Sequence, residues 1–402
     1  MRPGLMDSVK IAPEAYDAKN GLIARLAERY NYDPWRVRIL DMQRASLCLP
    51  NPPSHLLPPD LSSRYRFATL VLQGNGFTFT TSETSSSEMP ASRVETPYHL
   101  MAVPDANAGS TITLTYEGGP IADFHSLDLV EIMGKPSRYY FAFKEPVLGT
   151  PLHAYLVLNP FANCAYRCKY CSRLPYFGSA PRAYRTTLQR TVREVLAAVD
   201  SPNEVRFVNI ITGSMASAEA DIALCQDVIE TFARAGFGHC EYGVYTSNIR
   251  TRKQMELLRK HGVVFFTVTV ETTSAEARYR LHEPGNPKRL VSFDEIVGVI
   301  KSAEDIFPCV NTTMMLGYEP ADCIKRNFDV LAKETRVTIN HYIPRVWLRR
   351  QYDLIHPTAR TLDYYVDLFD FIERGINAGK RTIGAFFEDR FGIPRFKWRY
   401  RS

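Results

Sequence analysis

Residues 241–271, EYGVYTSNIRTRKQMELLRKHGVVFFTVTVE, contain one complete strand–helix–strand unit. Two runs rich in valine, phenylalanine, tyrosine and threonine, at 241–247 and 263–271, predict strands, and the segment between them predicts a helix near 252–260. Apolar β-branched runs that alternate with helices are typical of a parallel sheet buried on both faces. This stretch therefore predicts an α/β fold.

The same alternation extends through residues 154–344. The other predicted strands lie at 154–159, 204–212, 308–316 and 336–344, and the other predicted helices lie near 186–200, 219–235, 292–304 and 323–333. Right-handed crossovers between parallel strands produce either an open doubly wound sheet or a barrel. Six strand–helix units are too few for a closed eight-unit barrel, so a partial (β/α)6 barrel is favoured. In either architecture, functional side chains gather at the carboxyl ends of the strands.

Changes in composition divide the chain into four predicted segments. They are an N-terminal helical segment with a proline-rich linker (1–62), a small β-rich unit (63–150), the partial barrel (151–345) and a basic helical C-terminal extension (346–402). We therefore expect an α/β core with a helical and β-rich addition before it.

The overall composition is that of an ordinary soluble globular protein, with 45% hydrophobic and 23% charged residues. The sequence has neither 18 consecutive apolar residues nor an N-terminal signal-peptide pattern, so a cytoplasmic protein without a membrane segment is expected. The net charge of +6 is modest, and residues 345–402 hold 12 Lys and Arg against 7 Asp and Glu. This basic segment is either a solvated surface or a region that attracts an anionic substrate.

Three of the eight cysteines fall within eight residues, in NPFANCAYRCKYC (159–171), directly after the first predicted strand. Thiolates at such close spacing select zinc or iron–sulfur clusters. Structural zinc sites use four ligands, commonly in two pairs, and no second pair is present here. Three thiolates on a four-iron cluster would leave one iron open for chemistry. The remaining cysteines are scattered singly, as small buried apolar residues are: Cys48, Cys225, Cys240, Cys309 and Cys323.

The pattern Cys-x3-Cys-x-Tyr-Cys after the first strand of a β/α series resembles the signature of the radical S-adenosylmethionine (radical SAM) superfamily, single-cluster type. The resemblance covers roughly residues 154–344. It implies a radical SAM core with a [4Fe-4S] cluster held by Cys164, Cys168 and Cys171, and S-adenosylmethionine chelated by the open iron. It also implies reductive cleavage of that cofactor to a 5′-deoxyadenosyl radical, which abstracts a hydrogen atom from the substrate.

The resemblance further assigns residues to the S-adenosylmethionine site. Tyr170 matches a position near the adenine, and Glu271, at the end of the fourth strand, matches a position on the ribose or the methionine. Residues 212–214, Thr-Gly-Ser, stand where the family usually has a Gly-Gly-Glu-like motif. They lack its carboxylate, so a hydroxyl or a backbone carbonyl would receive the ammonium group. The expected set at the ends of these two strands is Tyr170, Thr212, Gly213, Ser214 and Glu271.

Four more cofactor contacts are expected further along the chain. Arg280 could hold the cofactor carboxylate through a bidentate pair, with Arg278 as the competing residue. Residues 313–319, TMMLGYE, resemble the family's adenine motif with two departures, and Leu316 and Gly317 would let the adenine approach the backbone. Ile343, on the sixth strand, could pack on the same ring.

Candidates for the substrate side are polar residues at or near the strands: Tyr245, Asn248, Asn311, His341 and Arg345. The scarcity of cysteine in the first 150 residues and its absence after Cys323 argue against a second cluster. The sequence thus predicts a lyase, mutase or transferase that acts on a small polar metabolite, which could be anionic. The reaction would be a rearrangement, a tailoring step or the formation of a carbon–carbon bond. Flavodoxin or ferredoxin would supply the electron. The alternatives are an RNA-modifying enzyme that uses the basic tail FKWRYRS, although a nucleic-acid partner is not favoured, and a non-catalytic iron–sulfur or zinc-binding protein.

Overall fold

The computed structural model describes residues 13–45, 67–74, 77–83, 98–105, 109–116, 119–124, 126–133, 139–141, 154–160, 164–171, 181–342 and 353–377. The chain forms two compact units. One comprises residues 1–135, 345–352 and 398–402, and the other comprises residues 136–344 and 353–397.

The described residues of the first unit form two helices and two antiparallel sheets. Helix α1 (Pro13–Tyr30) confirms the expected N-terminal helix, whereas α2 (Pro34–Ala45) was not predicted. The buried carboxylate of Asp41 links them, because it pairs with Lys19 of α1 at 2.7 Å and with Arg44 at 2.7 Å. One sheet has the strand order β2-β1-β6 and the other β3-β4-β5. The strands are β1 (Phe67–Gly74), β2 (Phe77–Glu83), β3 (Tyr98–Asp105), β4 (Gly109–Tyr116), β5 (Gly119–Phe124) and β6 (Ser126–Met133).

The second unit is built on one sheet of seven strands, in the order β13-β12-β11-β10-β9-β8-β7. Six of them are parallel, which confirms the six predicted strands: β8 (Tyr155–Leu158), β9 (Phe207–Ile211), β10 (Glu241–Thr246), β11 (Val263–Glu271), β12 (Cys309–Met315) and β13 (Thr338–Tyr342). The seventh strand, β7 (Tyr139–Phe141), pairs antiparallel with β8. Although β7 lies in the stretch expected to belong to the β-rich unit, it extends the parallel sheet.

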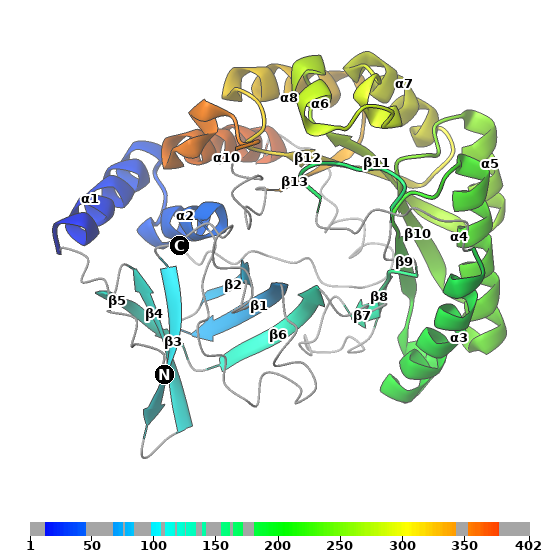
Figure 1. The fold of residues 1–402 in the computed structure, drawn as a ribbon, viewed down its shortest axis with the longest axis horizontal. Coiled ribbons are helices and arrows are strands. Elements are labelled where there is room, and N and C mark those ends of the chain that lie inside the picture. The colour runs from blue at the N-terminus through cyan, green and yellow to red at the C-terminus, as the bar shows by residue number, and fades with distance from the viewer. Residues whose placement is uncertain are drawn as a thin grey trace, which may run out of the picture. The chain divides into compact units, whose positions relative to one another are not determined.

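Helices follow the strands and form an arc on the outer side of the sheet, so that the unit has the form of a partial barrel (Figure 1). The five predicted helices are present, and α10 lies within the basic extension that was expected to be helical. The helices are α3 (Pro181–Ala198), α4 (Ala218–Phe232), α5 (Arg252–Lys260), α6 (Ala275–Leu281), α7 (Phe293–Glu304), α8 (Ala321–Glu334) and α10 (Leu362–Asn377). Helix α6 was not predicted, because its seven residues are too few to show helical periodicity. Among the described helices, none is long and apolar enough to cross a membrane.

The two faces of the sheet differ in chemistry. Thr246 of β10 donates to Asp221 of α4 at 2.7 Å, so Thr246 and its register partners face the helices. Val268, the register partner of Thr246, is apolar and buried, and so is Phe266, the register partner of Val244. The residues between them, such as Tyr245, point to the opposite face. The helix-covered face is therefore the apolar core, and the inner face is left for other chemistry.

The inner face is closely packed around Gly243 of β10. A Cβ atom there would lie 2.6 Å from Phe207 Cζ and 2.8 Å from Asn209 Oδ1. We therefore expect Gly243→Ala to lower the free energy of unfolding by about 1–3 kcal/mol in urea, because an overpacked core must shift. Gly298→Ala, in α7 with open space around it, is the matched control and should be neutral or stabilising by up to about 1 kcal/mol. An equal effect of the two substitutions would contradict this reading of the sheet.

Candidate active site

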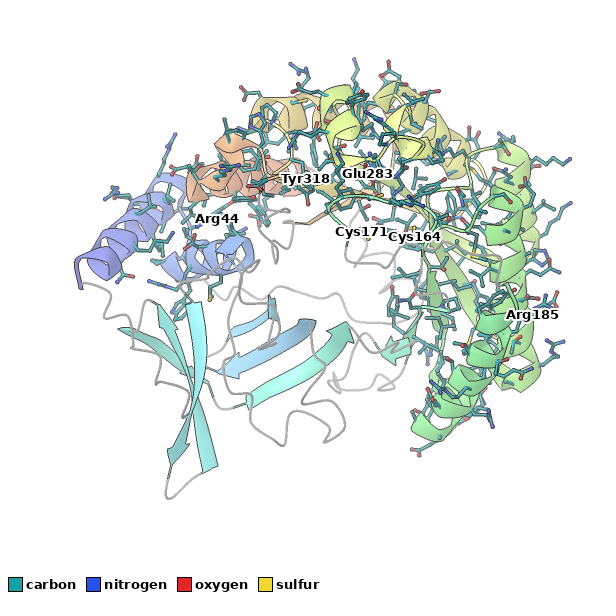
Figure 2. The ribbon with its side chains drawn as sticks, viewed as in Figure 1. Arg44, Cys164, Cys171, Arg185, Glu283 and Tyr318 are labelled. Atoms are coloured by element: carbon teal, nitrogen blue, oxygen red, sulfur yellow. The ribbon has the colours of Figure 1, made fainter. Side chains whose placement is uncertain are left out.

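The cysteine loop, residues 164–171, follows β8 at the carboxyl edge of the sheet. Its three cysteines form no disulfide and are half-buried, and Cys164 and Cys171 lie inside the arc of helices (Figure 2). The backbone N–H of Ala165 donates to Ser214 O at 2.8 Å, just beyond β9. On the other side, Lys169 N donates to Leu281 O, the last residue of α6, at 2.9 Å. The loop is thus fixed between two neighbouring segments.

A buried hydrogen-bond network supports the middle of the loop. The Tyr166 hydroxyl donates to Asn248 Oδ1, and Asn248 Nδ2 donates to Asp221 Oδ2 at 2.8 Å. The Asp221 carboxylate also accepts from Met215 N at 2.7 Å and from the Thr246 hydroxyl. Burial raises the pKa of Asp221, although its three donors oppose the shift. Asn248, expected as a substrate-side candidate, is therefore engaged in holding the loop.

A second buried carboxylate, Glu271, ends β11. Its backbone adopts φ 60°, in the left-handed region that few non-glycine residues visit. One oxygen forms an ion pair with Lys288, and the other lies 3.4 Å from His282 Nε2. Burial alone would raise the pKa of Glu271, but Lys288 and His282 outweigh it and hold the pKa well below its ordinary value. Both partners come from the connection between α6 and α7.

This charged group adjoins the cysteine loop. Cys168 and His282 form an isolated antiparallel bridge, and Asn286 Nδ2 donates to Cys168 Sγ at 3.5 Å. Burial would lower the pKa of His282, but the neighbouring Cys168 sulfur and Glu271 carboxylate raise it to about 9. His282 is therefore protonated near neutral pH, beside the sulfur and the carboxylate.

The donor set fits an iron–sulfur cluster. Three soft sulfurs project from one anchored loop, and a side-chain N–H already points at one of them. Among the described residues, no three His, Cys, Asp or Glu side chains lie together closely enough to hold a single metal ion. The thiolates of a four-iron cube bind different irons, so they need not converge on one point.

The residues expected around S-adenosylmethionine gather at this same edge. Thr212 and Ser214 are buried directly after β9, where the Thr212 hydroxyl donates to Gly213 O at 3.1 Å. The Tyr170 ring packs on His282 and on Tyr318, with centroids 5.9 and 5.7 Å apart. The Tyr170 side chain thus connects the cysteine loop with the segment that follows β12.

The other residues expected to contact the cofactor follow β12 or lie in α6, and some fall outside the described residues. Leu316 is fully buried, and Gly317 has φ 110° and accepts a hydrogen bond from His356 N at 2.8 Å. The Arg280 guanidinium donates to the backbone carbonyls of Leu354 and Tyr318, so its described hydrogen bonds are to the protein itself. Ile343 and the substrate candidate Arg345 lie outside the described residues, and for His341 only the backbone position on β13 is described.

Glu319, the acidic residue that closes the 313–319 motif, secures the turn into α6. Its buried carboxylate accepts from Thr273 N and Ser274 N, each at 2.6 Å, and from the Thr273 hydroxyl at 2.8 Å. Since α6 leads directly into His282 and Asn286, Glu319 helps position the groups beside Cys168.

Polar side chains line the inner face of the sheet. Tyr245, Thr267 and Asn311 align across three strands, and Asn311 Nδ2 donates to the Thr267 hydroxyl at 3.4 Å. On β9, in register with Gly243, Asn209 Nδ2 donates to the Tyr155 hydroxyl at 2.9 Å. Asn209 Oδ1, on a side chain that is only 5% exposed, has no hydrogen-bond partner in the described structure. A buried acceptor without a partner is costly, so this face suits a ligand that donates to it.

Sequence reasoning overlooked several of these residues. Asn209 interrupts the apolar strand FVNII (207–211), and that interruption is the signal that could have identified it. His282, Asn286 and Lys288 follow α6 in a Pro- and Gly-rich connection, where no periodic pattern points to them.

The buried network around Asp221 gives a testable prediction for the loop. Asp221→Ala should lower the free energy of unfolding by about 3 kcal/mol, because three buried donors lose their acceptor. Urea unfolding measures this loss. Glu230→Ala is the control in the same helix, where the carboxylate accepts from Gln226 in an exposed pair, and the loss should be much smaller. Equal losses would show that the network does not carry the predicted stability.

Comparison with known proteins identifies a family for this part of the chain. Residues 158–331 match the model of the Radical SAM superfamily. No curated protein matches the sequence.

Several solved structures align with part of this chain. Coproporphyrinogen III oxidase (HemN) from Escherichia coli, described as a radical SAM enzyme, aligns with 55% of this chain and 51% of its own, at 11% identity and a TM-score of 0.38. Streptococcus suis SuiB bound to S-adenosylmethionine aligns with 54% of this chain and 47% of its own, at 14% identity and 0.36. The protein anSMEcpe, with bound AdoMet and the Cp18Cys peptide, aligns with 59% and 66%, at 11% identity and 0.42. The chain thus spans about half the length of the first two, and such distant likeness does not transfer a substrate.

Proposed function

We propose that this chain is an enzyme that cleaves S-adenosylmethionine reductively. Residues 158–331 match the model of the Radical SAM superfamily, whose members use a [4Fe-4S] cluster and S-adenosylmethionine. The observation that carries the proposal is the anchored cysteine loop, in which Cys168 already receives a side-chain N–H at 3.5 Å. Cys164, Cys168 and Cys171 would hold the cluster. When bound, the cluster and S-adenosylmethionine supply a 5′-deoxyadenosyl radical that abstracts a hydrogen atom.

The chain's own residues would orient S-adenosylmethionine and exclude water. The segment Thr212–Ser214 would receive the ammonium group, through a hydroxyl or a backbone carbonyl. Tyr170, Leu316 and Gly317 would border the adenine, with Ile343 packing on it. Glu271 would act on the ribose or the methionine. In the described structure its carboxylate is already engaged by Lys288 and His282, so such a contact would have to be shared with them.

The inner face of the sheet supports a small polar metabolite as the substrate. Tyr245 and Asn311 offer a hydroxyl and an amide there, and Asn209 Oδ1 lacks a partner within the described structure. Hydrogen bonding of this kind fixes an unactivated carbon in place for hydrogen abstraction. The proposed outcome is rearrangement, tailoring or carbon–carbon bond formation in the cytoplasm, with flavodoxin or ferredoxin as the electron donor.

The test is anaerobic reconstitution with iron and sulfide, followed by dithionite and S-adenosylmethionine. The wild-type protein should release 5′-deoxyadenosine and methionine, and Cys168→Ala should reduce both products to background because one iron loses its ligand. Cys240→Ala is the matched control, since Cys240 is buried directly before β10, at the edge of the sheet opposite the loop, and it should retain both products.

The outcomes also separate the other functions. If the wild-type protein holds an intact cluster and makes neither product, it is a non-catalytic iron–sulfur protein. Stoichiometric zinc in the purified protein would indicate a zinc-binding protein instead. Salt-dependent binding of tRNA would favour an RNA-modifying enzyme over one that acts on a small metabolite.

A further inference from the structure

The connection between α6 and α7 encloses Cys168 from one side. Leu281 O accepts from Lys169 N at 2.9 Å, His282 bridges to Cys168 through the backbone, and the amide of Asn286 lies on the Cys168 sulfur. By contrast, the contact described for Cys164 Sγ is with the backbone N–H of Tyr166, within the loop itself, at 3.4 Å. Cys168 therefore receives a side-chain donor from a separate segment of the fold.

The orientation of the Asn286 amide is fixed by its other end. Asn286 Oδ1 accepts from Lys288 N at 2.9 Å and caps the short 3₁₀ turn Pro287–Arg289. Because an amide has one oxygen and one nitrogen, this cap leaves Nδ2 for the sulfur and settles which way the side chain points. The backbone N–H of Asn286 also donates to Glu283 O at 3.1 Å, and the side chain is buried. The side-chain amide therefore has little freedom to turn away from the sulfur.

Two cationic side chains lie near this sulfur, and both face the Glu271 carboxylate. Lys288 forms an ion pair with one of its oxygens, and His282 Nε2 lies 3.4 Å from the other. The neutral amide of Asn286 is thus the group directed at Cys168 by its own geometry.

We propose that the Asn286 N–H···S bond raises the reduction potential of the cluster bound through Cys168. The inference rests on the proposed function, because it requires the cluster. When one electron enters from dithionite or a flavodoxin-like donor, negative charge on the cluster and its sulfur ligands increases, and an N–H dipole aimed at one sulfur stabilises the reduced state more than the oxidised state. Asn286 is then a positioning residue that makes the first electron transfer easier, without touching the reacting atoms.

Asn286→Asp is the sharpest test, because it keeps the cap oxygen and the shape while removing the N–H. The reconstituted protein should bind the same iron and sulfide as the wild type. In a titration followed by electron paramagnetic resonance, its midpoint should move to a more negative potential. The ratio of reduced to oxidised cluster at the wild-type midpoint should fall at least threefold, a shift of about 28 mV for one electron. Asn286→Ser, which also keeps a cap oxygen, should shift the midpoint in the same direction without adding a carboxylate.

Asn327→Asp is the matched control. Its amide donates to the sulfur of Cys323 at 3.6 Å, a cysteine outside the cluster loop, so the same chemical change should leave the midpoint in place. An unchanged or more positive midpoint in both Asn286 variants, with the cluster intact, would overturn the inference and leave the proposed function standing. Loss of the cluster in both Asn286 variants but not in Asn327→Asp would also overturn it, because Asn286 would then serve assembly. A wild-type protein that binds no [4Fe-4S] cluster would refute the proposed function itself.

Discussion

The carboxylate of Asp221 is the contact on which the candidate active site depends. It has no exposed surface, and it joins the segment after β9, the end of β10 and, through Asn248, the cysteine loop. A carboxylate is buried at a large cost unless donors satisfy it, and here three donors from two segments do so. The hydrogen bonds of Asp221 therefore stabilise the fold and also hold the cysteine loop in place, so a substitution that removes them should affect both.

Two further buried carboxylates extend this arrangement around the edge of the sheet. Glu271 holds Lys288 and His282, and Glu319 holds the backbone of Thr273 and Ser274. Each joins a strand end to a connection that comes later or earlier in the chain. The site is made of loops, and acidic groups in the interior hold those loops where the apolar core does not reach.

The sequence was informative where a pattern repeats and silent where a single contact decides. Six strands and five helices of the second unit could be predicted from runs of apolar residues, which encode burial directly. Helix α6 is too short to show a period, and β7 has an alternative partner that only tertiary structure reveals. The roles of polar residues were the hardest to predict, because a sequence shows which groups can form hydrogen bonds but not which partners they contact. Asn248 was expected on the substrate side, yet it holds the loop, while Asn209 and Asn286 passed unnoticed.

The strand order has a consequence for how the site is made during synthesis. From β7 to β13 each strand pairs with the one that precedes it in the chain, so the sheet can grow in the order in which it leaves the ribosome. The three cysteines emerge early, directly after β8, but their supports at Ser214, Asn248 and His282 emerge later, the last of them more than a hundred residues after Cys168. Until then the thiols belong to an unsupported loop. A nascent chain or fragment that stops before α6 would therefore carry every sulfur of the motif and still lack the frame that gives those sulfurs their positions.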